Sequence, residues 1–209
     1  MTRRPRVVAL VGVDGSGKTT QAHRLAAALT EVGLPATYWQ NAGGRRWFGR
    51  LAKRLGRGSD AQRLLGRAGL LLVESILRWL AIARALLRSR LRGRVAVMDR
   101  YAVCQYASIR AHEGSRVAEW FARAAYALFP RPDMTFFLAL DAAEAVRRID
   151  LRGEDHESEE FLATSDVAYR SLPEFKSFVV IDASGTPDEV TARINEHLEM
   201  LAGPTYARP

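Results

Sequence analysis

The chain has 209 residues, 48% of them hydrophobic, and carries a formal net charge of +8. This length is enough for one well-buried domain and short for two, and the apolar fraction excludes a disordered chain, so we expect a single domain over residues 1–209. The single cysteine, Cys104, excludes an internal disulfide and is typical of the reducing cytoplasm, where we expect the protein to act.

Two segments resemble targeting or membrane signals, and the sequence argues against both. Arginines precede the apolar run that ends at Val11, but that run is very short for a secretory signal and leads directly into the motif described below. The apolar stretch Leu70–Leu87 is interrupted by Glu74, Arg78 and Arg84, which favours a buried amphipathic helix over a membrane span.

The positive charge is concentrated between residues 45 and 94, where fourteen lysines and arginines oppose only Asp60 and Glu74. One interpretation is a surface for nucleic acid or anionic lipid. The other, which we favour, is a field that attracts phosphorylated substrates. We therefore expect a small-molecule phosphate acceptor as the partner, rather than nucleic acid or a membrane.

The first predicted element is a strand at Val7–Val11, followed by a glycine-rich loop and a helix over Lys18–Val32. Residues Gly12–Thr19 read GVDGSGKT and match the phosphate-binding pattern G-x-x-x-x-G-K-[ST]. Glycines let backbone N–H groups point at an anion, and the helix N-terminus adds a favourable dipole. We expect a nucleoside triphosphate to be held by Gly12, Asp14, Gly15, Ser16, Gly17, Lys18, Thr19 and Thr20.

Three positions of this loop have distinct predicted roles. Lys18 is placed to reach the β- and γ-phosphates, and the Thr19 hydroxyl to reach Mg²⁺. Asp14 is not needed to hold phosphates and would repel them. We favour a role for its carboxylate on a hydroxyl of the acceptor, and the alternative is a residue that only favours the turn.

Further along the chain, apolar runs alternate with helical patterns, which predicts a parallel sheet built from βαβ units. The remaining strands are expected near Ala36–Gln40, Val95–Met98, Met134–Leu140 and Phe178–Ile181. Gly33 and Gly93 are predicted to end helices. Capping boxes are predicted at Asp141 to Glu144 and at Thr186 to Glu189.

The strand near Val95–Met98 leads into Asp99 and then Arg100. An aspartate at the carboxyl end of a strand beside a phosphate-binding loop can hold Mg²⁺, so Thr19 and Asp99 are the predicted metal residues. Arg100 adds a cation at the same edge of the sheet.

A lid is predicted over about residues 147–160. Arg147, Arg148 and Arg152 precede an acidic stretch that contains Gly153 and few apolar residues. An arginine inserted beside the migrating phosphoryl group stabilises the charge that develops there. The alternative is a solvated helix with exposed ion pairs. Residues from about Gly203 are expected to form a loose tail.

Taken together, these motifs resemble the thymidylate kinase family of nucleoside monophosphate kinases. The matching pieces are GVDGSGKTTQ at Gly12–Gln21, Gly43-Gly44, Asp99-Arg100-Tyr101, Pro132-Asp133, Arg148 to Glu154, Tyr169, and Ile181–Ser184. The resemblance implies an α/β fold of three layers, the P-loop NTPase fold, with a five-stranded parallel sheet flanked by helices. It also implies ATP with Mg²⁺ and commonly a homodimer.

The resemblance also implies roles for individual residues. Lys18 would bind the donor phosphates, Asp14 a sugar hydroxyl of the acceptor, and Arg100 the acceptor phosphate. Arg78 falls on the helix position of an arginine that contacts the base. Arg148 and Arg152 resemble lid-borne catalytic cations, and they complete the predicted catalytic set with Lys18 and Asp99.

Departures from the family pattern cluster on the acceptor side. The family's Thr-Arg-Glu-Pro stretch here reads Trp39-Gln40-Asn41-Ala42, so an arginine is replaced by Gln40, and Arg45 or Arg46 could substitute for it. Glu74 replaces an aromatic residue and either binds an acceptor or pairs with Arg78. Cys104 replaces a serine, and Ser108-Ile109 replaces Tyr-Gln. The predicted acceptor residues are Asp14, Gln40, Glu74, Arg78, Arg100 and Cys104.

The function that these features predict is transfer of the γ-phosphoryl group of ATP to dTMP or a related nucleotide. Two alternatives stay open. One is a kinase of another small molecule, such as a nucleoside or a sugar, on the same fold. The other is a nucleotide-binding protein that associates with nucleic acid through the basic segment 45–94.

Overall fold

The computed structural model describes residues 6–41, 61–153 and 157–197. Its centre is a sheet of five parallel strands in the order β2-β3-β1-β4-β5. The strands are β1 (Val7–Val11), β2 (Ala36–Gln40), β3 (Val95–Asp99), β4 (Met134–Ala139) and β5 (Val179–Asp182). All five predicted strands are therefore confirmed, with ends that shift by one residue: β3 includes Asp99, β4 stops before Leu140, and β5 begins after Phe178 and includes Asp182.

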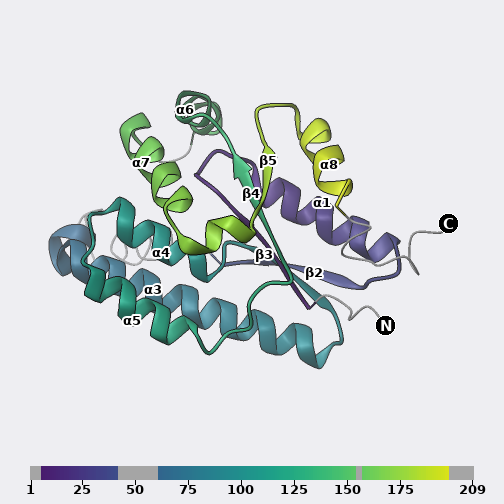
Figure 1. The fold of residues 1–209 in the computed structure, drawn as a ribbon, viewed down its shortest axis with the longest axis horizontal. Coiled ribbons are helices and arrows are strands. Elements are labelled where there is room, and N and C mark those ends of the chain that lie inside the picture. Colours follow the sequence, from purple (N-terminus) through teal and green to yellow (C-terminus); the bar gives the residue numbers. More distant parts are fainter. Residues whose placement is uncertain (1–5, 42–60, 154–156, 198–209) are drawn as a thin grey trace.

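Helices cover both faces of the sheet, which gives the predicted three layers (Figure 1). They are α1 (Lys18–Glu31), α3 (Ala61–Leu91), α4 (Ala102–Ala111), α5 (Arg116–Tyr126), α6 (Ala142–Leu151), α7 (Glu159–Arg170) and α8 (Pro187–Asn195), with a short 3₁₀ helix η1 at Pro173–Ser177. Helices α3 and α5 run side by side, joined by hydrogen bonds from Trp79 to the Ala125 carbonyl and from Tyr126 to the Ser75 carbonyl.

The central strand β1 divides its side chains between two cores. Val8 and Leu10 pack with α1 and α8 on one face, and Val7, Ala9 and Val11 pack with α3, α4 and α5 on the other. Alternate residues of a strand point to opposite faces, so a strand covered on both sides is a continuous apolar run. This is why the apolar run at Val7–Val11 correctly predicted a strand.

The helix ends agree with the sequence, with one correction. Gly33 and Gly93 have φ of 83° and 61°, as expected of glycines that end helices. The capping box at Thr186 is present, with the Glu189 N–H donating to Thr186 Oγ1 at 3.3 Å and the Thr186 N–H to Glu189 Oε2 at 2.7 Å.

The box predicted at Asp141 is only half formed. Asp141 caps α6 by accepting from the Ala143 N–H at 2.9 Å. Glu144, however, accepts from Arg147 and Arg148 instead of reaching back to the helix start. Two guanidinium groups within one turn offer charge-assisted hydrogen bonds, which are stronger than one to a backbone N–H.

Some predictions fall partly or wholly outside the described residues. In the predicted lid, Arg147 and Arg148 belong to α6, Arg152 follows its last residue, and α7 begins at Glu159, whereas residues 154–156 are not described. The tail from Gly203 and the pair Arg45 and Arg46 also lie outside the described residues.

The helix predicted at Leu70–Leu87 lies within α3, but the expectation that it is buried holds for only part of it. The side chains of Ile82 and Ala85 are buried, whereas those of Leu72, Ile76, Leu80 and Leu87 are exposed. Across the described residues, none of the helices has both the length and the apolar character needed to cross a membrane.

Candidate active site

The predicted phosphate-binding loop connects β1 to α1 and lies tightly against the neighbouring elements. Gly12 has φ of 140°, and a Cβ atom there would lie 2.7 Å from the Leu138 carbonyl oxygen. A Cβ atom at Gly15 would lie 2.6 Å from the Ala145 carbonyl oxygen of α6. Both glycines are therefore required by backbone conformation and by space. The Ser16 hydroxyl is buried and has no hydrogen-bond partner among the described residues.

Lys18 and Asp14 of this loop contact each other. Lys18 Nζ donates to the Val13 carbonyl at 2.6 Å and to Asp14 Oδ1 at 3.3 Å. Burial lowers the pKa of the Lys18 ammonium group. Burial alone would raise the pKa of the Asp14 carboxyl, but Arg100 and Lys18 together hold that pKa well below its usual value. Asp14 is therefore an ionised carboxylate between two cations. Thr20 is exposed on the first turn of α1.

The two predicted metal residues lie together. Thr19 Oγ1 donates to Asp99 Oδ2 at 2.6 Å, which joins the start of α1 to the end of β3. Asp99 is 3% exposed, and its Oδ1 atom is buried with no hydrogen-bond partner in the described part of the chain. A hydroxyl beside a carboxylate with one uncommitted oxygen is a donor set that suits Mg²⁺, because Mg²⁺ prefers oxygen ligands. The residues present therefore fit the ion that the family implies.

A residue that the sequence reasoning missed supports Asp99. Tyr38 of β2 donates from its hydroxyl to Asp99 Oδ2 at 3.3 Å, and its ring stacks on His23 with the ring centres 3.6 Å apart. Burial and the Asp99 carboxylate raise the pKa of Tyr38 to about 12, so the hydroxyl stays protonated and donates. Only the neighbouring positions of β2 and β3 bring these side chains together, and no motif in the sequence marks them.

Arg100 has an unusual backbone conformation at the end of β3. Its φ is 75°, in the left-handed region that residues other than glycine rarely adopt. Its N–H donates to the Leu10 carbonyl at 3.1 Å, and its guanidinium group forms an ion pair with Asp14. Burial alone would lower the pKa of Arg100, but the Asp14 carboxylate raises it. A fixed cation thus lies next to the phosphate-binding loop.

A buried polar cluster lies behind Arg100. Arg78 of α3 is 5% exposed, and its Nη1 donates to Oε1 of Gln105 on α4 at 2.7 Å. Arg78 Nε is buried without a hydrogen-bond partner among the described residues. Burial raises the pKa of the Tyr169 hydroxyl of α7 and Cys104 raises it further, whereas the charges of Arg100 and Arg78 lower it. Sequence reasoning identified Arg78 but missed Gln105.

The other predicted acceptor residues are placed differently. Cys104 is buried, and its Sγ accepts from the Tyr101 N–H at 3.4 Å at the start of α4, so part of its role is structural. Gln40 is exposed at the end of β2, paired in register with Asp99. The side chain of Glu74 lies outside what the structure describes.

The two predicted lid arginines have different environments. Arg152 Nη2 lies 3.4 Å from the Gly15 carbonyl oxygen, at the phosphate-binding loop. Arg148 donates to the carbonyls of Ala183 and Ser184 at 2.9 Å each and to Glu144 at 2.7 Å. The structure thus brings Arg152 to the loop and uses Arg148 to join α6 to the segment after β5.

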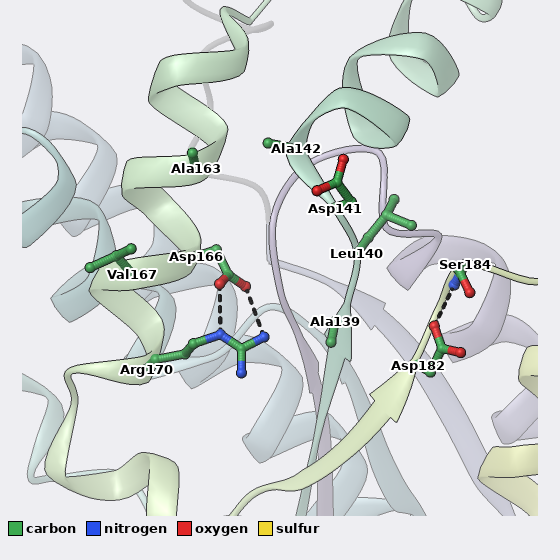
Figure 2. A pocket seen from close by; sticks show the side chains of 10 residues that line it. All are labelled: Ala139, Leu140, Asp141, Ala142, Ala163, Asp166, Val167, Arg170, Asp182 and Ser184. Atoms are coloured by element: carbon green, nitrogen blue, oxygen red, sulfur yellow. Dashed lines mark hydrogen bonds and ion pairs between the residues drawn. The ribbon is translucent and has the colours of Figure 1, made fainter.

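A separate pocket lies at the carboxyl ends of β4 and β5, beside α6 and α7 (Figure 2). Figure 2 shows Asp166 pointing toward Arg170, and Asp182 toward the Ser184 backbone. Asp141, which also lines the pocket, caps α6. Because each of these carboxylates already has a partner, we assign no ligand to this pocket.

Comparison with known proteins agrees with this geometry. The family model described as Thymidylate kinase matches residues 10–194. The chain is 31% identical over 192 residues to a probable thymidylate kinase of Pyrococcus abyssi, an overlap of 88% of this chain and 90% of that one. It is 32% identical over 206 residues to a probable thymidylate kinase of Halorubrum lacusprofundi, covering 94% of this chain and 99% of that one.

A vertebrate relative extends the comparison. A thymidylate kinase of Danio rerio is 28% identical over 210 residues, covering 99% of this chain and 96% of its own length. The match to the family model spans the phosphate-binding loop, the Asp99-Arg100 pair and the helices that carry the arginines. The chain belongs to the thymidylate kinase family.

Proposed function

We propose that the protein transfers the γ-phosphoryl group of ATP to dTMP, giving dTDP and ADP. The observation that carries this proposal is the position of Asp14, which contacts the loop lysine Lys18 on one side and Arg100 on the other. The residues suited to a phosphate donor and those suited to a phosphate acceptor therefore meet at one carboxylate. Family membership supports the choice of ATP and dTMP.

On the donor side, we assign the phosphates to the backbone N–H groups of the loop and to Lys18, which would stabilise the charge on the transferred group. Thr19 and Asp99 would hold Mg²⁺, which supplies charge neutralisation at the phosphates when it is bound. Arg152, which already lies beside Gly15, is the arginine that we assign to the migrating phosphoryl group. Arg148 would contribute by holding the segment after β5 in place.

On the acceptor side, we assign the phosphate of dTMP to Arg100 and a sugar hydroxyl to Asp14. Arg78 and Gln105 offer a buried guanidinium and a buried amide, which suit the carbonyl and N–H groups at the edge of a pyrimidine. Cys104, Gln40 and Glu74 stay predictions as acceptor contacts. A phosphate acceptor needs no general base, so the absence of an obvious one from this cluster of described residues is consistent with the proposal.

We also infer a cytoplasmic homodimer, on the basis of the family resemblance and of apolar side chains exposed on α3 and α5. These side chains are Leu72, Ile76, Leu80, Leu87, Leu91, Val117, Trp120 and Phe121. Exposed apolar surface on this scale is typical of protein interfaces. Light scattering after gel filtration tests the dimer, and a monomer at micromolar concentration would contradict it.

An activity panel tests the proposed reaction. Purified protein is assayed with ATP and Mg²⁺ against dTMP, dUMP, dCMP, thymidine and a sugar phosphate, with ADP release as the readout. We expect the highest kcat/KM with dTMP, and a fall in kcat of at least about 10²-fold in Lys18→Met, which keeps the aliphatic stem but removes the charge. Preference for thymidine or for the sugar phosphate would favour the alternative small-molecule kinase.

A further inference from the structure

We propose that Asn41 is a positioning residue for the acceptor site, because it holds Arg100 in the backbone conformation that turns its guanidinium group toward Asp14. This inference rests on the proposed role of Arg100 in binding the acceptor phosphate. Asn41 is the first residue after β2.

Asn41 contacts three consecutive residues of the neighbouring chain segment. Its backbone N–H donates to the Asp99 carbonyl at 3.0 Å. Its side-chain Nδ2 donates to the Arg100 carbonyl at 2.8 Å and lies 3.2 Å from Met98 Sδ. Asn41 is 1% exposed, so these hydrogen bonds are protected from competition with water. One buried side chain therefore fixes the end of β3.

The Arg100 backbone needs such a contact. Gln40 and Asp99 form the last pair of the β2–β3 ladder, so the Arg100 carbonyl lies beyond the ladder. A non-glycine residue with φ of 75° persists only where its surroundings hold it there. The Leu10 carbonyl accepts from the Arg100 N–H on one side, and Asn41 Nδ2 donates to the Arg100 carbonyl on the other. Together the two hydrogen bonds fix both peptide groups around the unusual φ.

The consequence is electrostatic as well as geometric. With its backbone held in this way, Arg100 reaches Asp14 across the end of β1. A relaxed backbone at Arg100 would swing the side chain to a different direction, and its guanidinium group would leave the site where the acceptor phosphate is expected. Loss of the Asn41 amide should therefore weaken acceptor binding, with little effect on the ATP side.

The test is a double-mutant cycle in steady-state kinetics on the full chain. The variants are Asn41→Ala, Arg100→Ala and the double variant, with kcat and the KM values for dTMP and ATP measured separately. We expect Asn41→Ala to raise the KM for dTMP roughly tenfold, the effect of losing a buried hydrogen bond, and to change the KM for ATP less than about twofold. If Asn41 acts through Arg100, the double variant should bind dTMP no worse than Arg100→Ala.

A matched control separates positioning from a general loss of stability. Gln21 is a buried amide on α1 that donates from Nε2 to the Pro187 carbonyl at the start of α8 at 2.8 Å. Gln21→Ala should lower the melting temperature without raising the KM for dTMP. If Asn41→Ala cannot be recovered in folded form, Asn41→Ser provides the same comparison.

The outcomes distinguish the inference from the function on which it rests. An unchanged KM for dTMP in Arg100→Ala would remove the proposed role of Arg100. A raised KM in Arg100→Ala with no change in Asn41→Ala would overturn only the role of Asn41. A further loss in the double variant beyond Arg100→Ala would also overturn it, because Asn41 would then contact the acceptor directly or act by another route.

Discussion

The donor side and the acceptor side of the site are built in different ways. The donor side is centred on a contiguous loop, Gly12–Thr19, in which Gly12 and Gly15 have no room for a side chain. Thr19 of this loop donates to Asp99 of β3, and Arg152 reaches the loop from the end of α6. The acceptor cluster is assembled from four separate elements, with Arg78 from α3, Arg100 after β3, Gln105 from α4 and Tyr169 from α7. A local motif specifies the first, whereas the second depends on how distant segments pack.

This difference suggests which parts can change among relatives. A loop that holds phosphates through backbone N–H groups tolerates no residue that disturbs its glycines. A pocket made of side chains from several helices can exchange them one at a time, provided that each buried polar group keeps a partner. The departures from the family pattern at Gln40, Glu74 and Cys104 are at positions that we predict to contact the acceptor. Mutations can test how independent the two sides are.

The prediction with the largest expected effect distinguishes the roles of the two lid arginines, Arg148 and Arg152, on the donor side. We expect Arg152→Ala to lower kcat by about 10³-fold or more, because an arginine beside the migrating phosphoryl group typically contributes about 10³–10⁵. Arg148→Ala should lower kcat less than about tenfold and raise the KM for ATP instead, because Arg148 holds the carbonyls of Ala183 and Ser184. Stopped-flow or coupled assays at saturating ATP measure both.

Arg147 serves as the control for this pair. It lies on the same helix, its side chain is 63% exposed, and it forms an ion pair with Glu144, so Arg147→Ala should leave both parameters within about twofold of the parent. Equal losses of kcat in Arg148→Ala and Arg152→Ala would show that both arginines act on the transferred group.

The second prediction concerns the acceptor side. Gln105→Leu keeps the approximate volume but removes the acceptor for Arg78 Nη1 and leaves a buried guanidinium donor unpaired. Because an unsatisfied buried group costs about 1–3 kcal/mol, we expect the KM for dTMP to rise at least about fivefold while the KM for ATP stays constant. Isothermal titration with dTMP alone provides a direct measure of the loss.

Trp79→Phe is a suitable control for this prediction. It removes the hydrogen bond from Trp79 Nε1, on the same helix α3, to the Ala125 carbonyl, without removing the partner of Arg78. It should lower stability and leave dTMP binding unchanged. A rise in the KM for ATP in Gln105→Leu would contradict the independence of the two sides.

The sequence predicted the fold well for a physical reason. In a parallel sheet, each strand is a short apolar run bounded by residues that end it, and all five runs were visible. The conformation of the loop likewise follows from the glycines in its own motif. Thr19 and Asp99 were predicted as partners because a strand-terminal carboxylate and a helix-start hydroxyl meet at one edge of such a sheet.

What the sequence missed depends on contacts between segments. Gln105, Tyr38 and Asn41 are ordinary residues on a helix or at a strand end, and their importance comes from the partners Arg78, Asp99 and Arg100. The capping box expected at Asp141 failed for a similar reason, since Glu144 has two competing arginines within one turn. Pattern reasoning assigns a residue its local role and cannot weigh the partners that the fold provides.

The prediction with the smallest expected effect tests whether Tyr38 of β2 belongs to the donor side. Tyr38→Phe keeps the stack on His23 and removes only the hydroxyl that donates to Asp99 Oδ2 at 3.3 Å. Asp99 would then be free to turn, and we expect the Mg²⁺ concentration for half-maximal activity to rise about threefold to fivefold with kcat at saturating Mg²⁺ unchanged. Mn²⁺ binding to the protein–ATP complex, followed by electron paramagnetic resonance, measures the same change without turnover.

Tyr101→Phe is the control for this comparison, because the Tyr101 hydroxyl donates to the Pro130 carbonyl at 2.7 Å and is not bonded to Asp99. Equal Mn²⁺ affinities in Tyr38→Phe and in the parent protein would mean that the Thr19 hydroxyl alone orients Asp99. In that case β2 would contribute no side chain to the donor side. A shift confined to Tyr38→Phe would instead show that the donor side, like the acceptor side, draws a side chain from a neighbouring strand that no motif marks.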